Sequence, residues 1–454
     1  MGRIAICGGG PIGLLAGMLL ARAGHAVTVL EADPAEPPAD PRAAWENWAR
    51  PGVAQFRQPH NLLPRFQRIL EVELPDLTER LLAAGCLRKT ELVPLPPSIV
   101  DRTPRPDDDR FEYVTGRRPV VEAVFAAAAS VEPGVVVRRG TKVDGLVSAG
   151  GVVSGVRLAT GETLRADLVV DAMGRRSPSS AWLVAAGAKE PVNEVEAGGF
   201  SYYSRFYRGP RMPDRRAAPF TPLGTFSLLT LPADNGTWSV TVVSASGDAP
   251  LKVLRDADRF ERLVSASPAH AQWLAGEPIT DIVVMAGVLD RYRRFVLAGR
   301  PLVTGFAAIG DAWACTNPTA SRGLTIGLMH AQQLRDVVRD HGGDPLAWDG
   351  ATEDVLTPFY RDQVRADRAR VAEMDALRRG DEPPSADPAV ARFEAAAMTD
   401  ADVFRALLES AGGLAPFSEI VTRPGVKERI DAVAPGAGGR PGPNRAQLLD
   451  LLAG

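Results

Sequence analysis

Apolar residues change their spacing twice within the first thirty positions of the chain. Residues 3–7 (RIAIC) form a short apolar run that is typical of a buried parallel strand. Residues 11–23 carry large apolar side chains at helical spacing, and residues 26–30 are again a short apolar run. The order of these runs, with glycines between them, predicts a strand, a helix and a second strand, which together form a βαβ unit.

The turn between the first strand and the helix has the chemistry of a dinucleotide site. Gly8, Gly10 and Gly13 fit the pattern G-x-G-x-x-G. The first glycine allows a sharp turn, the second lets a pyrophosphate approach the backbone, and the third lets the helix pack on the strand. Glu31 ends the second apolar run 18 residues after Gly13, where a carboxylate holds a ribose hydroxyl. Its charge would repel a 2′-phosphate, so FAD or NAD fits this site and NADP does not.

Later segments distinguish a flavin from a nicotinamide cofactor. A dehydrogenase would continue with further βαβ units, but residues 135–170 instead indicate a meander of three strands separated by glycine turns. The meander leads to Asp171 and Gly174, where the chain can pass close to a ligand. A later apolar strand enters Asp311, whose carboxylate can accept from a ribitol hydroxyl. A helix begins near Gly323, and its first amides can face the carbonyl edge of a flavin.

At this point the chain resembles the group A FAD-dependent monooxygenases of the aromatic-hydroxylase type, whose FAD domain is like that of glutathione reductase. Four ordered motifs carry the resemblance over residues 1 to about 335: the glycine motif with Glu31, Arg118-x-x-Val121-Glu122, the segment 171–177, and Gly310-Asp311 with Pro318 and Gly323. Residues 50–60 (RPGVAQFRQPH) are similar to a stretch of a bacterial subgroup of oxygenases and epoxidases from natural-product pathways.

The resemblance implies which residues hold FAD. The pyrophosphate, ribose, adenine and flavin ring would be contacted by Gly8, Gly10, Pro11, Ile12, Gly13, Glu31, Arg42, Arg118, Val143, Asp171, Gly174, Gly310, Asp311, Pro318, Gly323, Leu324 and Thr325. The chain departs from the family at three positions. Ala172 stands where glycine is common, Ala314 where histidine is usual, and Ser321 where the first glycine of a G-x-G is usual.

The same resemblance implies the fold and its division into domains. We expect an α/β protein with a Rossmann-like FAD-binding domain (βαβ with a three-stranded meander), interleaved with a mixed β-sheet substrate domain and followed by C-terminal helices. The expected boundaries are 1–75, 110–180 and 290–345 for the FAD domain, 76–109 and 181–289 for the substrate domain, and 346–454 for the helical region.

The middle of the chain predicts the substrate sheet. Apolar and polar residues alternate over 199–208, 225–231 and 237–245, which indicates strands. Tyr202 and Tyr203 point to opposite faces of such a strand, so at most one of them faces a pocket. The candidate pocket residues are Gln55, His60, Tyr203, Arg205, Trp238 and Met285, and no residue is assigned a catalytic role. Packing in the sheet is the alternative for the last four, and a structural role is the alternative for His60.

Composition removes several other classes of function. The 454 residues include 52 Lys and Arg against 55 Asp and Glu, so a net charge of −3 gives no chain-wide positive field for nucleic acid. The three cysteines and five histidines show no metal-ligand spacing, which favours the reducing cytoplasm and no structural metal. The chain has no apolar run of 18 residues, and the apolar N-terminal stretch is interrupted by glycines too early for a signal peptide.

We therefore expect a monooxygenase that inserts one oxygen atom from O2 into a small organic substrate, by hydroxylation or epoxidation of a secondary metabolite. By resemblance, NADPH or NADH binds transiently and reduces FAD, and oxygen is transferred through a flavin C4a-hydroperoxide. Three alternatives stay open: a two-component oxygenase supplied by a partner flavin reductase, a flavin-binding partner or maturation protein, and a flavin-dependent halogenase. The halogenase motif W-x-W-x-I-P is absent, the nearest segment being Trp45-Glu-Asn-Trp48. The substrate and the oligomeric state are not specified.

Overall fold

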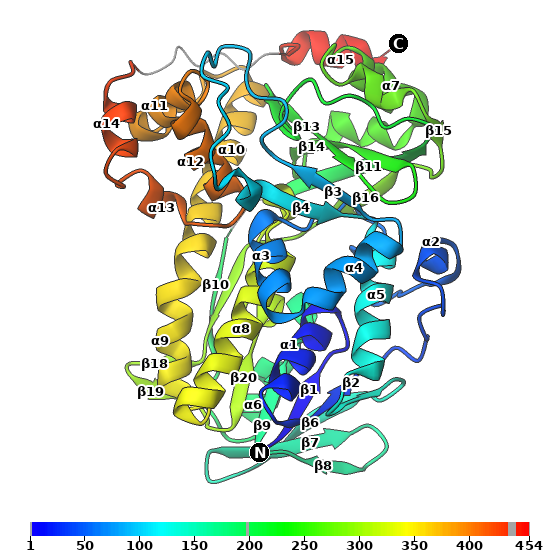
Figure 1. The fold of residues 1–454 in the computed structure, drawn as a ribbon, viewed down its shortest axis with the longest axis vertical. Coiled ribbons are helices and arrows are strands. Elements are labelled where there is room, and N and C mark those ends of the chain that lie inside the picture. Colours follow the sequence, from blue (N-terminus) through cyan, green and yellow to red (C-terminus); the bar gives the residue numbers. More distant parts are fainter. Residues whose placement is uncertain (1, 197–198, 435–441, 454) are drawn as a thin grey trace.

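The computed structural model describes residues 2–196, 199–434 and 442–453 (Figure 1). A five-stranded parallel sheet forms the lower half of the molecule in this view. Its order is β20 (Phe306–Ala308), β9 (Leu168–Asp171), β1 (Arg3–Cys7), β2 (Ala26–Leu30) and β5 (Val135–Arg138). The predicted βαβ unit is confirmed, because α1 (Pro11–Arg22) connects two strands that pair in parallel over their whole length.

Helices and the meander enclose this sheet. The helices α5 (Arg118–Val131) and α8 (Gly323–His341) pack on either side of α1. Between β5 and β9 the chain forms an antiparallel three-stranded sheet of β6 (Val143–Ala149), β7 (Val152–Leu158) and β8 (Thr163–Arg165). This is the meander that the glycine turns predict. The largest hydrophobic core of the molecule lies among these elements.

A second, antiparallel sheet lies in the upper half of the molecule (Figure 1). Its order is β12 (Phe220–Leu223), β13 (Phe226–Pro232), β14 (Thr237–Ala245), β11 (Phe200–Arg208) and β15 (Glu277–Pro278), and β16 (Val283–Ala286) also pairs with β11. One face packs on α7 (Ala257–Ser265) and on α15 (Arg445–Ala453) at the end of the chain. We call this the outer face. The opposite, inner face packs on α10 (Thr357–Arg379).

The inner face departs from the usual pattern of a half-exposed sheet. Every residue of β13 and β14 is buried, including the serines and threonines that alternate with their apolar residues. The polar members of the alternation therefore do not mark a solvent-facing side. They mark a covered polar surface between the sheet and the rest of the molecule.

The helices after β20 differ in part from expectation. The long helix α10 runs from beside the parallel sheet to the second sheet, and Tyr360, Val364 and Met374 lie on its buried side. The helices α11 (Pro388–Ala397), α12 (Ala401–Ala411) and α14 (Val426–Asp431) share a small core of their own. The last helix leaves this group, because Leu448 and Leu452 of α15 are buried in the core of the outer face.

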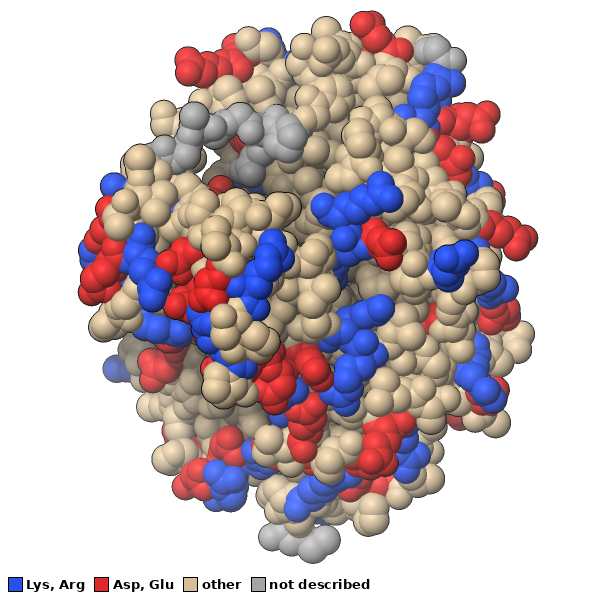
Figure 2. Space-filling model, turned by 45° about the horizontal axis from the view of Figure 1, so that its top comes forward, with Lys and Arg blue, Asp and Glu red and all other residues tan. Residues whose placement is uncertain are grey.

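Shorter elements complete the molecule. They are α2 (Ala44–Asn47), α3 (Pro64–Glu73), α4 (Pro75–Ala83), β3 (Leu87–Thr90), β4 (Glu112–Thr115), α6 (Ser179–Ala185), β10 (Val192–Val195), β17 (Arg291–Arg294), β18 (Val296–Leu297), β19 (Arg300–Pro301), β21 (Ala314–Cys315), α9 (Pro345–Val355) and α13 (Phe417–Ile420). Over the described ranges, no helix has the length and apolar character that crossing a membrane requires. Acidic and basic side chains are interspersed on the face shown in Figure 2.

Candidate cofactor and substrate site

Three strand ends bring the candidate cofactor motifs to one edge of the parallel sheet. Cys7 of β1 pairs with Asp171 of β9, and Asp171 pairs with Ala308 of β20. Because these strands are parallel, their carboxyl ends meet, and the segments that follow them lie side by side. Ligands of open parallel sheets bind in the crevice at this edge.

The glycine turn after β1 leaves open space at one of its three motif glycines. Gly8 has a φ of +108°, and a Cβ atom there would lie 2.6 Å from the carbonyl oxygen of Ala172. A Cβ atom at Gly13 would lie 1.9 Å from the carbonyl oxygen of Gly8, whereas one at Gly10 would meet no atom within 4 Å. The chain's own packing therefore requires Gly8 and Gly13. Gly10 instead faces space that a pyrophosphate can enter, at the N-terminus of α1.

Glu31 belongs to a buried ion-pair network. Its Oε2 accepts from the backbone N–H of Gly9 at 3.0 Å and from the guanidinium of Arg50. Arg50 also donates to Glu122 at 2.8 Å, and Glu122 accepts from Arg118 one turn earlier on α5. The side chain of Arg50 is only 3% exposed. The carboxylate that the sequence assigns to a ribose thus has a partner within the chain, which sequence reasoning missed.

Other predicted cofactor residues lie in different surroundings. Arg42 pairs with Asp40, and its side chain is 61% exposed at the surface. Val143 is buried in the main core at the start of β6. The carboxylate of Asp171 accepts from the Met173 N–H and the Ser177 hydroxyl. Asp171 therefore orders the following turn, in which Gly174 has a φ of +74°.

The N-terminus of α8 opens beside Asp311. The Oδ1 of Asp311 lies 3.8 Å from the place that a Cβ atom of Gly323 would occupy. Burial raises the pKa of the Asp311 carboxyl, and the charges of Arg118 and Arg175 oppose that shift. Thr325 is fully buried in the first turn of α8, and its hydroxyl has no hydrogen-bond partner within the described ranges. A carboxyl group and free helix amides therefore face the same region.

The remaining members of the α8 motif have packing roles. Gly310 turns the chain after β20 with a φ of +56°. Ile12 of α1 lies 2.6 Å from the place that a Cβ atom of Gly327 would take, so this glycine lets α1 approach α8 closely. Leu324 is buried in the core, Pro318 is half-buried before the helix, and Pro11 begins α1.

Ser321, which stands where the monooxygenases that the chain resembles usually have glycine, has a backbone conformation that glycine favours. Its φ of +54° and ψ of 22° lie in the left-handed region. This conformation carries a steric cost for residues other than glycine. Ser321 therefore adopts a left-handed backbone conformation that its side chain makes sterically unfavourable.

The register of β11 decides which side chains face the inner side of the second sheet. Tyr202 pairs with Val243 and with Met285, and these three belong to the inner core with Cys315. Tyr203 belongs instead to the outer core that α7 and α15 cover.

Three of the predicted pocket residues fall on the outer face. Trp238 pairs with Tyr207 and belongs, like Tyr203, to the outer core, and Arg205 pairs with Glu261 of α7 at 2.6 Å. Tyr203, Arg205 and Trp238 therefore do not share a face with Met285, whereas Tyr202 does. The strand alternation revealed two faces but not which one turns toward the parallel sheet.

The loop over residues 55–60 reaches the inner face through a residue that the sequence analysis did not select. The Oε1 of Gln58 accepts from the hydroxyl of Ser204 on β11 at 3.1 Å. Gln55 and His60 are half-buried nearby in the chain. Burial and the charge of Arg118 lower the pKa of His60 to about 3, so its imidazole is neutral near pH 7.

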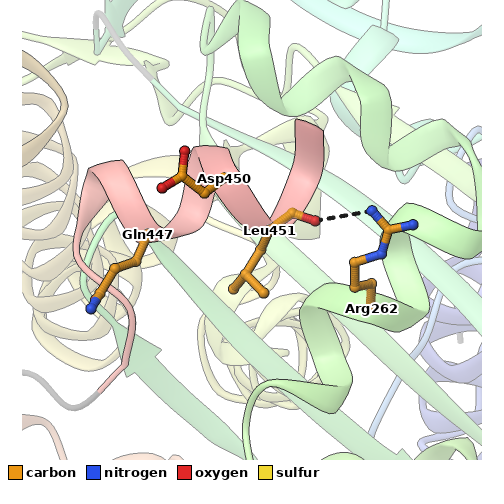
Figure 3. Close-up of a pocket in the computed structure, with 4 residues that line it drawn as sticks. All are labelled: Arg262, Gln447, Asp450 and Leu451. Carbon is orange, nitrogen blue, oxygen red and sulfur yellow. Dashed lines mark hydrogen bonds between the residues drawn. The ribbon is translucent and has the colours of Figure 1, made fainter. Parts of the chain in front are cut away.

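The open hollow in Figure 3 lies elsewhere. It is lined by Arg262 of α7 and by Gln447, Asp450 and Leu451 of α15 and measures about 560 Å³. It belongs to the outer side of the second sheet and contains none of the predicted site residues. The three cysteines are buried thiols, and no group of three or more potential metal ligands occurs over the described ranges.

Comparisons with known proteins identify the fold. No family model matches the chain. Protein Rv3254 of Mycobacterium tuberculosis is 27% identical over 184 residues, a match that spans 39% of this chain and only 38% of that protein.

Two solved structures cover far more of the chain. PqsL, a probable FAD-dependent monooxygenase from Pseudomonas aeruginosa, matches with a TM-score of 0.62 and 18% identity over 82% of this chain and 96% of its own. The flavin-dependent brominase Bmp2 matches with a TM-score of 0.60 and 17% identity over 90% of this chain and 93% of its own. The protein therefore has the fold of FAD-dependent monooxygenases, which flavin-dependent halogenases share, as the resemblance predicted.

Proposed function

We propose that the protein is an FAD-dependent monooxygenase that inserts one oxygen atom from O2 into a small organic substrate. The observation that carries the proposal is the open space at Gly10, since the other glycines of the turn are required by packing. This space lies at the sheet edge where parallel-sheet proteins bind ligands. An orphaned buried hydroxyl on Thr325, in the first turn of α8, supports a second contact for the same ligand.

The residues present fit FAD. Backbone amides around Gly10 and the start of α1 would bind the pyrophosphate, and Glu31 with its partner Arg50 would lie beside the ribose. Asp311 would bind a ribityl hydroxyl, and the first amides of α8 would contact the carbonyl edge of the flavin. When bound, FAD supplies the redox and oxygen chemistry, and the protein supplies orientation and exclusion of water.

The inner face of the second sheet is proposed to cover the substrate. Its buried serine and threonine hydroxyls and Gln58 provide hydrogen-bonding groups, while Tyr202 and Met285 provide apolar contact area. We infer the discontinuous domain division given above, because β20 completes the parallel sheet and α8 packs beside α1. Hydroxylation or epoxidation, and NADPH or NADH as the reductant, are part of the proposal.

A halogenase is the second candidate, because the brominase Bmp2 shares the fold. The tryptophans nearest to a halogenase motif are buried, with Trp48 packed edge-on against Phe56 and Trp45 against Phe206. They serve packing at the base of the loop over residues 50–60. The monooxygenase is therefore the function we propose.

Visible spectroscopy under anaerobic conditions tests the proposal. The FAD-supplemented protein is expected to retain a flavin band near ~450 nm, which belongs to the cofactor itself. NADPH or NADH should bleach this band, faster in the presence of a suitable substrate. A bound flavin that resists both nucleotides would favour a partner reductase, and a protein that retains no flavin would contradict the proposal.

A further inference from the structure

Two arginines of β17 point toward the carboxyl edge of the parallel sheet. Arg291 and Arg293 are two residues apart, so their side chains lie on the same face of the strand. The backbone of β17 is itself held beside the segment that follows β20. The N–H of Arg293 donates to the carbonyl oxygen of Trp313 at 3.0 Å, and Arg291 pairs with Cys315 of β21.

Arg293 connects the two turns that carry predicted cofactor residues. We call residues 172–177, which follow β9, the β9 turn, and residues 309–312, which follow β20, the β20 turn. Arg293 donates from Nη2 to the carbonyl oxygen of Ser177 in the β9 turn at 3.0 Å, and from Nη1 to that of Ala312 in the β20 turn at 3.1 Å. Two nitrogens of one buried guanidinium therefore bind one carbonyl from each turn.

Arg291 joins the same two turns. Its Nη2 donates to the carbonyl oxygen of Arg175 in the β9 turn at 2.5 Å, and in a longer contact to that of Asp311 in the β20 turn at 3.4 Å. Both contacts come from one nitrogen, in contrast to the two nitrogens that Arg293 uses. We call the two arginines the β17 clamp.

The clamp takes over where the hydrogen bonds of the sheet end. β9 and β20 pair in parallel as far as Asp171 and Ala308, and the N–H of Ile309 still donates to the carbonyl oxygen of Asp171 at 2.9 Å. Beyond this point the backbones of the two turns exchange no further hydrogen bond within the described ranges. The guanidiniums therefore supply the links that set the spacing of the turns.

The clamp brings two cations close together, which is unfavourable in itself. Burial lowers the pKa of Arg293, and the nearby charge of Arg291 lowers it further, while the charge of Asp171 opposes the shift. A buried charge is costly unless hydrogen bonds compensate it. Here the compensating acceptors are backbone carbonyls of the turns, so the chain uses these cations to hold backbone in place.

We propose that Arg291 and Arg293 are positioning residues for the cofactor, because their clamp fixes the spacing of the two turns and so places Asp311 for FAD. This inference rests on the proposed function and adds residues that hold the site without contacting the ligand. The carbonyl of Asp311 and the next one along the chain, of Ala312, are both held by the clamp. A binding group must be fixed within ~0.5 Å of its productive position.

Lysine substitutions distinguish the two arginines, because lysine keeps the charge but has a single nitrogen. In Arg293→Lys this nitrogen cannot replace Nη1 and Nη2 at once, so one turn is released. In Arg291→Lys it can donate to both carbonyls, as Nη2 does, whereas Arg291→Met donates to neither. Arg294→Lys and Arg294→Met are the matched controls, because Arg294 lies on the opposite face of β17 and pairs with Glu194 at 2.6 Å.

FAD titration of the folded full-chain variants measures the effect on the cofactor. Arg293→Lys and Arg291→Met are expected to bind FAD at least ~10-fold more weakly than the wild-type protein and the controls, the scale of hydrogen bonds to a charged group. Arg291→Lys should recover most of the affinity that Arg291→Met loses. A side chain that only stabilised the fold would not make lysine succeed at one position and fail at the other.

The proposal is overturned if lysine has the same effect on FAD affinity at both positions, or if the Arg294 controls lose as much affinity as the clamp variants. If Arg293→Lys does not fold, the comparison at the half-buried Arg291 tests the proposal alone. Equal FAD affinities of the wild-type protein and Arg291→Met would then overturn it.

Hydrogen exchange of the FAD-free protein tests the clamp without the cofactor. Peptides that cover residues 172–179 and 309–316 should exchange faster together in Arg293→Lys and in Arg291→Met, and not in the controls. Unchanged exchange in both segments would overturn the proposal. Faster exchange in variants of a protein that binds no FAD would contradict the proposed function and leave the link between the turns standing. FAD binding that is equal in all variants would do the reverse.

Discussion

The edge of the parallel sheet and the inner face of the second sheet differ in the hydrogen-bond partners of their buried polar groups. At the edge, Glu31 and Asp171 are satisfied by Arg50, by backbone N–H groups and by a nearby hydroxyl. At the inner face, Tyr202 and Asp367 each leave one buried polar atom without a partner among the residues that the structure describes. The carboxylates of the first region are therefore satisfied within the chain, whereas the second region leaves a carboxylate oxygen and a phenol buried at a cost in folding free energy.

The largest loss of folding stability is expected at the close contact between α1 and the turn after β1. In Gly13→Val the new Cβ atom would lie 1.9 Å from the carbonyl oxygen of Gly8, so α1 must separate from the turn. We expect a loss of at least ~4 kcal/mol of folding free energy or failure to fold, as for severe overpacking. Urea unfolding or the yield of folded protein measures this. Near-normal stability would mean that the tight packing around the turn is wrong.

At the inner face of the second sheet, by contrast, removing a buried charge should increase the stability of the folded protein. Burial raises the pKa of Asp367 to about 7, with the nearby Asp290 adding to the shift, and with Gln363, Thr319 and Arg322 opposing it. A carboxyl whose pKa is raised on folding destabilises the protein above its unfolded pKa, and the penalty grows as the pH rises from about 4 to about 7.

Asp367→Asn should therefore be more stable than the wild-type protein at pH 8 by up to ~4 kcal/mol, and the difference should shrink toward pH 4. Urea unfolding of both proteins across this range provides the measurement, and Tyr202→Phe should also gain stability at both ends of the range. A difference that is independent of pH would show that Asp367 is already satisfied in the folded state.

The positive charge of Arg50 at the edge of the parallel sheet should be required for folding stability. Arg50→Gln would leave Glu31 and Glu122 buried without their shared cation, which costs ~3 kcal/mol or more in comparable pairs. Arg42→Gln is the matched control, because its pair with Asp40 is exposed and contributes little. Equal unfolding free energies for the two variants would show that the buried ion pairs of Arg50 stabilise the fold no more than an exposed pair does.

The smallest effect concerns the backbone before α8. Ser321→Gly restores the family residue at a position with a φ of +54°. We expect a gain of ~1 kcal/mol, the usual cost of a left-handed conformation in a residue with a side chain. A thermal shift of a few degrees upward would agree with this, and a destabilised variant would contradict it.

The sequence predicted the fold around the glycine turn well because backbone constraints appear in it directly. Only glycine allows the close approaches at Gly8 and Gly13, and the apolar runs specify β1, α1 and β2. The partner of Glu31 could not be predicted, because an ion pair between distant segments has no local pattern. The face of β11 was also undetermined, since both sets of alternating residues are buried on the neighbouring strands β13 and β14 and only tertiary packing decides which one turns inward.

If the space at Gly10 binds the FAD pyrophosphate, a side chain at this position should block FAD, and an FAD titration of Gly10→Val measures this. Gly10 has a φ of −76° and a ψ of 176°, which valine adopts readily, so the variant should fold with an unchanged unfolding midpoint. Gly350→Val in α9 is the control, since a Cβ atom there also meets nothing. We predict that Gly10→Val binds FAD at least ~100-fold more weakly than the wild-type protein and the control. A folded Gly10→Val protein that binds FAD as tightly as the wild-type protein would contradict the account.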